Sequence, residues 1–158
     1  MTRPGRLALA LVALWLGAMI MMSTAATAVF GVVPPGQGGE IMRRIFPVYY
    51  AGSLAVPVLA LALALPGARR RRAGIAGLAT LGLAFAVAAW NALVVRPRLA
   101  DLRQAMHTPE GLGDPALAEA FGRLHVQSVS LLSALMLLAL VFICLEILAR
   151  PRPGAAGN

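Results

Sequence analysis

The sequence contains no lysine, a single cysteine and only six acidic residues among 158. Charged residues make up 13% of the chain, about half the share usual in a globular domain, whereas hydrophobic residues make up 59%. The lone Cys144 excludes an intrachain disulfide framework and a thiolate metal centre. The sequence also lacks the motifs of serine hydrolases, zinc proteases, P-loop proteins and dinucleotide-binding enzymes. These absences argue against a water-soluble domain and favour a non-enzymatic protein without a cofactor.

All 14 basic residues are arginines, and the formal net charge is +8. A charge of this size can indicate nucleic-acid binding when the basic residues gather on one face. Here the arginines lie at the ends of apolar stretches, so we expect no nucleic-acid partner. A composition rich in arginine, alanine and leucine is typical of a GC-rich bacterial genome and suggests a bacterial protein.

The chain instead contains four long stretches without Asp, Glu or Arg, which together hold 102 residues. A helix needs about 20 apolar residues to cross the roughly 30 Å hydrocarbon core of a lipid bilayer. The sequence therefore predicts an all-α integral membrane four-helix bundle with an amphipathic loop outside the membrane, in a single domain over 1–150. The predicted spans are 7–33, 48–65, 73–95 and 124–149, with the polar loop at 96–123 and a disordered tail at 151–158.

The N-terminal segment 1–33 resembles a signal peptide, because two arginines precede an apolar run and Ala26-Thr27-Ala28 is a small-residue cleavage pattern. The apolar run is longer than such a peptide requires and continues past that pattern. We therefore expect the first helix to be retained as a span. The prolines and glycines of residues 34–39 predict a short loop after it, before Pro47 opens the second span.

The distribution of arginines predicts the orientation in the membrane. With four spans both termini lie on one side, where eight arginines gather, including the run Arg69 to Arg72 in a very short turn. Six arginines fall on the other side. Because basic residues are retained in the cytoplasm, we predict a cytoplasmic (inner) membrane protein with both termini cytoplasmic and the loop 96–123 in the periplasm.

Two patterns predict helix within the polar loop 96–123. Leu99, Leu102 and Met106 form an apolar stripe suited to lying on the membrane surface. Asp114 followed by Pro115 is typical of a helix N-terminus, with aspartate as the N-cap and proline at the first helical position. We expect that helix to continue into the fourth span.

Polar residues fall at the predicted periplasmic ends of spans two, three and four. Polar side chains at membrane depth are costly and tend to face the interior of a bundle. We therefore expect a polar cluster that binds a small solute, a lipid headgroup or a partner protein. The candidate residues are Tyr49, Tyr50, Asn91, Arg96, Arg98, His125 and Ser128.

Several of these candidates have a plainer interpretation. Asn91 could contact a substrate or form an interhelical hydrogen bond. Arg96 and Arg98 could bind an anion or a lipid phosphate, or could reach the membrane boundary beside Asp101. His125 could be a haem or metal ligand, a proton carrier, or an interfacial histidine bonded to a carbonyl.

These patterns leave three functional hypotheses. The first is a non-enzymatic membrane protein with roles in transport or stress tolerance, which as a transporter would be a homo-oligomer. The alternative is a small membrane redox protein in which His125, with Asn91 and Tyr50 nearby, serves a haem, a metal or a quinone. The third is a purely structural subunit.

Four short motifs resemble those of the transmembrane protein 205-like (TMEM205-like) family. They are Leu14-Trp15-Leu16-Gly17, Phe46-Pro47-Val48-Tyr49-Tyr50, Asn91 followed by Pro97-Arg98, and Phe121-x-x-x-His125-x-x-Ser128. Together they extend over nearly the whole chain. The resemblance implies a four-helix membrane protein with a retained first helix, and the family includes bacterial members of undefined function. It implies no reaction.

Overall fold

The computed structural model describes residues 3–68, 72–108 and 113–148, and within these ranges every regular element is helical. This confirms the predicted all-α four-helix bundle. The tail 151–158 and the arginines at 69–71 lie outside the described residues. The elements are α1 (Arg3–Val32), α2 (Pro35–Ala68), α3 (Arg72–Trp90), the π-helical turn η1 (Asn91–Val95), α4 (Arg96–Ala105) and α5 (Pro115–Leu148).

Four helical segments are long and apolar enough to cross a membrane. They are α1, α2, α5 and the continuous helix formed by α3, η1 and α4. In each, at most 28% of the most apolar stretch is buried inside the bundle. The remaining apolar side chains face outward, where lipid can cover them and water cannot do so favourably. The chain is therefore a multi-pass membrane protein.

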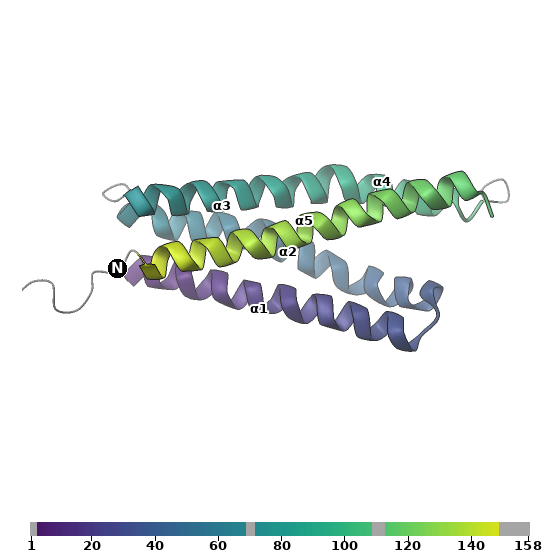
Figure 1. The fold of residues 1–158 in the computed structure, drawn as a ribbon, viewed down its shortest axis with the longest axis horizontal. Helices are drawn as coiled ribbons and strands as arrows, with labels where there is room; N and C mark the ends of the chain where they lie inside the picture. Colours follow the sequence, from purple (N-terminus) through teal and green to yellow (C-terminus); the bar gives the residue numbers. More distant parts are fainter. Residues whose placement is uncertain (1–2, 69–71, 109–112, 149–158) are drawn as a thin grey trace, which may run out of the picture.

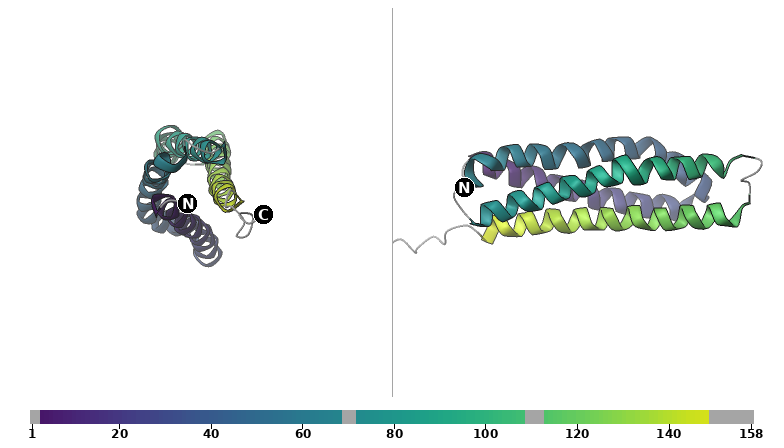
Figure 2. Two further views of the ribbon diagram at one scale, coloured as in Figure 1. Left: turned by 90° about the vertical axis from the view of Figure 1, so that its left-hand side faces the viewer. Right: turned by 90° about the horizontal axis from the view of Figure 1, so that it is seen from above.

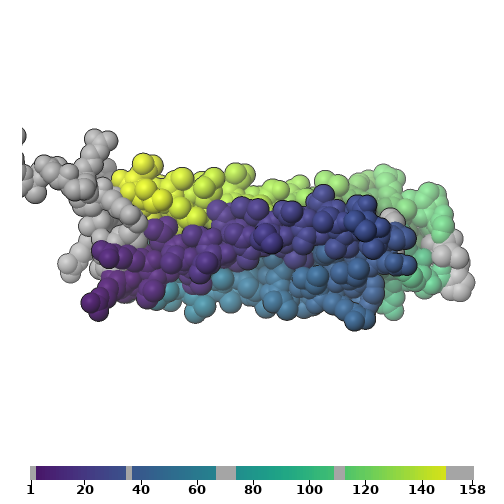
Figure 3. Space-filling model, turned by 90° about the horizontal axis from the view of Figure 1, so that it is seen from below, coloured from purple at the N-terminus to yellow at the C-terminus, as the bar shows by residue number. Residues whose placement is uncertain are grey.

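Consecutive helices run antiparallel, side by side (Figure 1). Viewed from the end that holds both termini, they form a curved row in which α1 and α5 are the outer members (Figure 2). Contacts join α1 to α2, α2 to α3, α3 to α5, and α5 back to α1. Figure 3 shows one long face, on which α1 lies between α2 and α5.

The apolar core is concentrated in the half of the bundle that holds the two termini. The buried residues of α1 all fall between Ala8 and Met19, and those of α5 fall between Leu135 and Phe142. Helix α5 lies close to Gly77 on α3, since a Cβ at this position would lie 3.3 Å from Oε1 of Glu146 and 3.4 Å from Cε2 of Phe142. The bundle is thus tightly packed at this end, and its other half carries the polar residues.

The structure corrects the predicted start of the second helix. The prolines and glycines at 34–39 were expected to form a loop, but α2 begins at Pro35, well before residue 48. Proline is well suited to the first helical position, where its missing N–H has no intrahelical partner. Glu40 stabilises this first part of α2 because its carboxylate accepts two hydrogen bonds from Arg43, each 2.8 Å long.

The structure also corrects the predicted loop at 96–123, of which 109–112 lie outside the described residues. The stripe of Leu99, Leu102 and Met106 does not form a separate helix on the membrane surface; α4 instead prolongs α3 outward (Figure 1). At η1 the N–H of Arg96 bonds to the carbonyl of Asn91, five residues back. This wider turn directly precedes Pro97, which lacks an N–H and crowds the carbonyl four residues before it.

The helix predicted from Asp114 and Pro115 is confirmed. Helix α5 begins at Pro115, and the N–H of Ala116 donates to Asp114 Oδ1 over 2.8 Å. This bond satisfies one of the N–H groups that a helix leaves free at its start. The polar segment is therefore largely a hairpin of α4 and the first turns of α5, which pack against each other.

Candidate functional site

Asn91 and Ser128 meet inside the bundle, where α3 gives way to η1 and faces α5. The Ser128 hydroxyl donates a 3.0 Å hydrogen bond to Asn91 Oδ1, and the Asn91 side chain is only 3% exposed. This is the interhelical hydrogen bond that was the plainer interpretation of Asn91. Both side chains thus fix the contact of two helices.

Arg96 contacts the aromatic residues at the outer part of α2. Its guanidinium carbon lies 4.5 Å from the ring centroid of Tyr50, a distance typical of a cation–π interaction. The Tyr50 ring also meets Tyr49 edge-on at 5.5 Å and Phe46 at 5.9 Å. Arg96 is therefore packed against a protein ring and links α4 to α2.

His125 does not join these contacts. It is exposed on α5, and its ring stacks on Phe121 with 6.1 Å between centroids. Phe121 in turn lies 5.7 Å from the guanidinium of Arg103 on α4. Within the described part of the chain, no group of three or more His, Cys, Asp or Glu side chains could hold a metal ion together. The haem, metal or quinone role of His125 stays a prediction.

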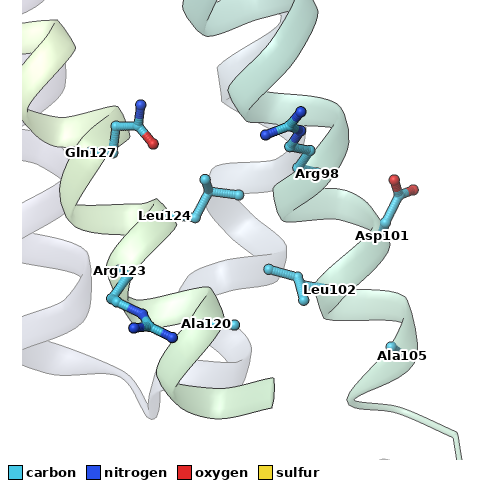
Figure 4. A pocket seen from close by; sticks show the side chains of 8 residues that line it. All are labelled: Arg98, Asp101, Leu102, Ala105, Ala120, Arg123, Leu124 and Gln127. Atoms are coloured by element: carbon cyan, nitrogen blue, oxygen red, sulfur yellow. The ribbon is translucent and has the colours of Figure 1, made fainter. Parts of the chain in front are cut away.

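Arg98 instead lines a groove between α4 and α5, which we call the α4–α5 groove (Figure 4). The groove has a volume of about 610 Å³ and is open to the surroundings. Leu102 and Leu124 extend from the two helices into the space between them, and the arginines of the two helices stand at different levels along it. Its lining residues are Arg98, Asp101, Leu102, Ala105, Ala120, Arg123, Leu124 and Gln127.

The α4–α5 groove is lined by charges of both signs. A guanidinium presents parallel N–H donors that match two phosphate oxygens. Arg123 has an ion pair with Glu119 at 3.5 Å, but both side chains are about two-thirds or more exposed, so the pair contributes little and leaves Arg123 available. Asp101 adds one carboxylate to the lining. The groove thus offers two positive charges, one negative charge and an apolar floor.

The structure therefore divides the predicted polar cluster into separate contacts. Asn91 pairs with Ser128, and Arg96 packs on Tyr50 beside Tyr49. Arg98 and His125 lie apart from them. The sequence argument missed Arg123 as a residue of the same groove as Arg98, because the groove depends on α4 and α5 folding back on each other. The only available signal was that both arginines belong to the same polar segment.

Comparison with known proteins gives one family. A family model described as a domain of unknown function, DUF4149, matches residues 10–108. No curated protein and no solved structure matches the chain. The matched range includes Asn91 and Arg98, whereas Ser128 and the α5 side of the groove lie beyond it.

Proposed function

The chain belongs to the DUF4149 family, whose function is undefined, and we propose that it binds the headgroup of a zwitterionic phospholipid in the α4–α5 groove. The observation that carries this proposal is the placement of Arg98 and Arg123 on opposite walls of a groove floored by Leu102 and Leu124. The arginines would hold the phosphate, and Asp101 would attract the headgroup ammonium. The resemblance to the TMEM205-like family adds a bacterial context and no reaction.

The position of the groove along the membrane normal supports a lipid as the ligand. The helix that runs from α3 through α4 covers 34 residues, or about 51 Å at 1.5 Å per residue, against a hydrocarbon core of about 30 Å. If the core begins at the N-terminus of α3, it ends near η1. Helix α4 then lies at the level of the lipid phosphates, where a soluble solute would compete with a dense layer of headgroups.

The excess of arginines near the termini supports an orientation with both termini in the cytoplasm, so the groove would lie in the periplasmic leaflet of the inner membrane. This orientation can be tested in cells with Cys144→Ser and a new thiol at His107→Cys, an exposed position after α4. We expect a membrane-impermeant maleimide to label it from the periplasm. Labelling only after the cytoplasm is opened would contradict the orientation.

Binding can be tested by native mass spectrometry of the full chain in detergent, titrated with phosphatidylethanolamine, phosphatidylglycerol or phosphatidylcholine. We expect phosphatidylethanolamine to bind, and Arg98→Gln or Arg123→Gln to weaken binding about tenfold, since a hydrogen bond to a charged group contributes roughly 1.5–3 kcal/mol. Arg44→Gln is the matched control, because Arg44 is an exposed arginine outside the groove.

Asp101→Asn distinguishes binding of the headgroup ammonium from binding of the phosphate. It should weaken binding of phosphatidylethanolamine but not that of phosphatidylglycerol, which has no ammonium and is repelled by the carboxylate. Displacement of the lipid by inorganic phosphate at millimolar concentration would show a free-anion site and contradict the lipid proposal. Equal binding by Arg98→Gln, Arg44→Gln and the wild type would contradict the groove as the site. Transport, stress tolerance and a homo-oligomeric state stay predictions.

A further inference from the structure

Three buried polar side-chain atoms have no well-formed hydrogen bond among the described residues, although two of them, the Tyr49 and Ser53 hydroxyls, interact with each other. They are Nε1 of Trp15 on α1 and the hydroxyl oxygens of Tyr49 and Ser53 on α2. Trp15 is 6% exposed and Ser53 is 2% exposed. An N–H or O–H group that is shielded from water and unpaired costs several kcal/mol in a hydrocarbon environment. This cost points to a bonding partner at this place.

The three residues lie at a similar depth in the bundle. Helices α1 and α2 are antiparallel and join at Val33 and Pro34, so positions equally far from that turn lie at the same depth. Trp15 precedes Val33 by 18 residues, and Ser53 follows Pro34 by 19. Tyr49 lies one turn from Ser53 on the same face of α2 and packs against the core cluster that contains Trp15.

Ser53 behaves unlike several other hydroxyl residues of these helices. Five of them donate to the backbone carbonyl four residues back on their own helix, whereas the Ser53 hydroxyl has no such bond. Its oxygen is buried and interacts with the Tyr49 hydroxyl, and since that contact uses only one of the two O–H groups, the other still needs an acceptor. The five are Thr24, Thr27, Thr80, Ser130 and Ser133.

A buried proline adds an acceptor at the same place. Pro57 follows Ser53 by four residues within α2, and proline has no N–H to donate to the Ser53 carbonyl. Membrane helices tolerate such prolines when polar side chains or ordered water complete the freed backbone group. The region therefore combines three donors with a carbonyl that has lost its usual donor.

We infer that this region binds a structural water molecule within the membrane, between Trp15, Tyr49, Ser53 and the helix turn opened by Pro57. Water fits because it accepts and donates at once: it accepts from the Trp15 N–H and a hydroxyl, and it donates to the Ser53 carbonyl. A buried water usually makes two to four such bonds. The site joins α1 to α2 and lies apart from the α4–α5 groove.

Radiolytic hydroxyl labelling of the full chain in lipid nanodiscs tests this inference, because X-rays convert a bound water into a radical that modifies adjacent side chains. We expect modification of Trp15, which is buried, and of Tyr49, whose hydroxyl oxygen is buried. Phe142, which is 1% exposed in the apolar half of the core, is the internal control and should stay unmodified. Absence of modification at Trp15 and Tyr49, or equal modification of Phe142, would overturn the inference.

Two substitutions test the partners of the water. Pro57→Ala restores an N–H that can donate to the Ser53 carbonyl, so modification of Tyr49 should be lost, while Pro47→Ala, at an exposed proline of α2, should leave it unchanged. Ser53→Ala should lower stability, because it takes away a bonded hydroxyl. If the buried Ser53 hydroxyl had no hydrogen bond, its removal would instead raise the stability. Retained modification in Pro57→Ala, or increased stability in Ser53→Ala, would contradict the site.

Discussion

Replacing Ser128 with alanine removes the hydroxyl that donates to Asn91 Oδ1 over 3.0 Å. The Asn91 side chain is 3% exposed, so water cannot replace the lost bond. An unsatisfied buried acceptor costs about 1–3 kcal/mol in water-soluble proteins, and interhelical hydrogen bonds in membranes measure about 0.6 kcal/mol on average and about 1.7 at most. We therefore expect Ser128→Ala to lower the free energy of unfolding by about 1 kcal/mol, roughly a fivefold change in the folded-to-unfolded ratio.

The assay is reversible unfolding in mixed micelles of mild detergent and sodium dodecyl sulfate, followed by circular dichroism. Ser130→Ala is the matched control, because the exposed Ser130 bonds only to the carbonyl of Val126 on its own helix, and its loss should change stability little. A double-mutant cycle with Asn91→Leu isolates the pair. A coupling energy below about 0.3 kcal/mol, within the error of additivity, would refute the assignment of this bond as an interhelical tie.

Three further pairs of substitutions test the packing, the helix start and the aromatic contact in the same assay. Gly77→Val should lower the free energy of unfolding by about 1–3 kcal/mol, since its side chain would press on α5. Gly82→Val is the control and should have a smaller effect, because there is open space at that position; equal effects would contradict close packing at Gly77. Asp114→Ala should lower the free energy of unfolding by about 1 kcal/mol, whereas Asp114→Asn should change it little, because asparagine also caps helices. Equal losses in the two variants would argue against the cap. Arg96→Gln should lower the free energy of unfolding by about 0.5–1 kcal/mol, and Arg96→Lys should lower it less, because lysine keeps a cation over the Tyr50 ring. No difference between the two variants would argue against the cation–π contact.

The sequence predicted the features that depend on composition and local chemistry. Four apolar stretches of sufficient length required membrane-spanning helices, and Asp114 before Pro115 marked the start of α5 correctly. The interhelical bond of Asn91 could also be anticipated, because a lone amide in an apolar helix has few other ways to be satisfied.

The sequence failed where one local pattern fits two structures. Proline at position 35 suits both a helix break and a helix start, and the structure shows a helix start, after which Glu40 and Arg43 form an exposed ion pair. The apolar stripe of α4 has the same period whether it faces lipid or another helix. The groove could not be predicted, because Arg98 and Arg123 line it only through the packing of α4 against α5, and no pattern in the sequence fixes which positions of the two helices face each other.

The most direct test of the lipid proposal is photo-crosslinking in the native membrane with a phosphatidylethanolamine that carries a diazirine in its headgroup, followed by peptide mapping. The proposal predicts that crosslinks concentrate on residues 98–105 of α4 and 120–127 of α5, and that they decline in Arg98→Gln. Crosslinks spread equally over the outer ends of α1 and α2, or unchanged by the substitution, would contradict it.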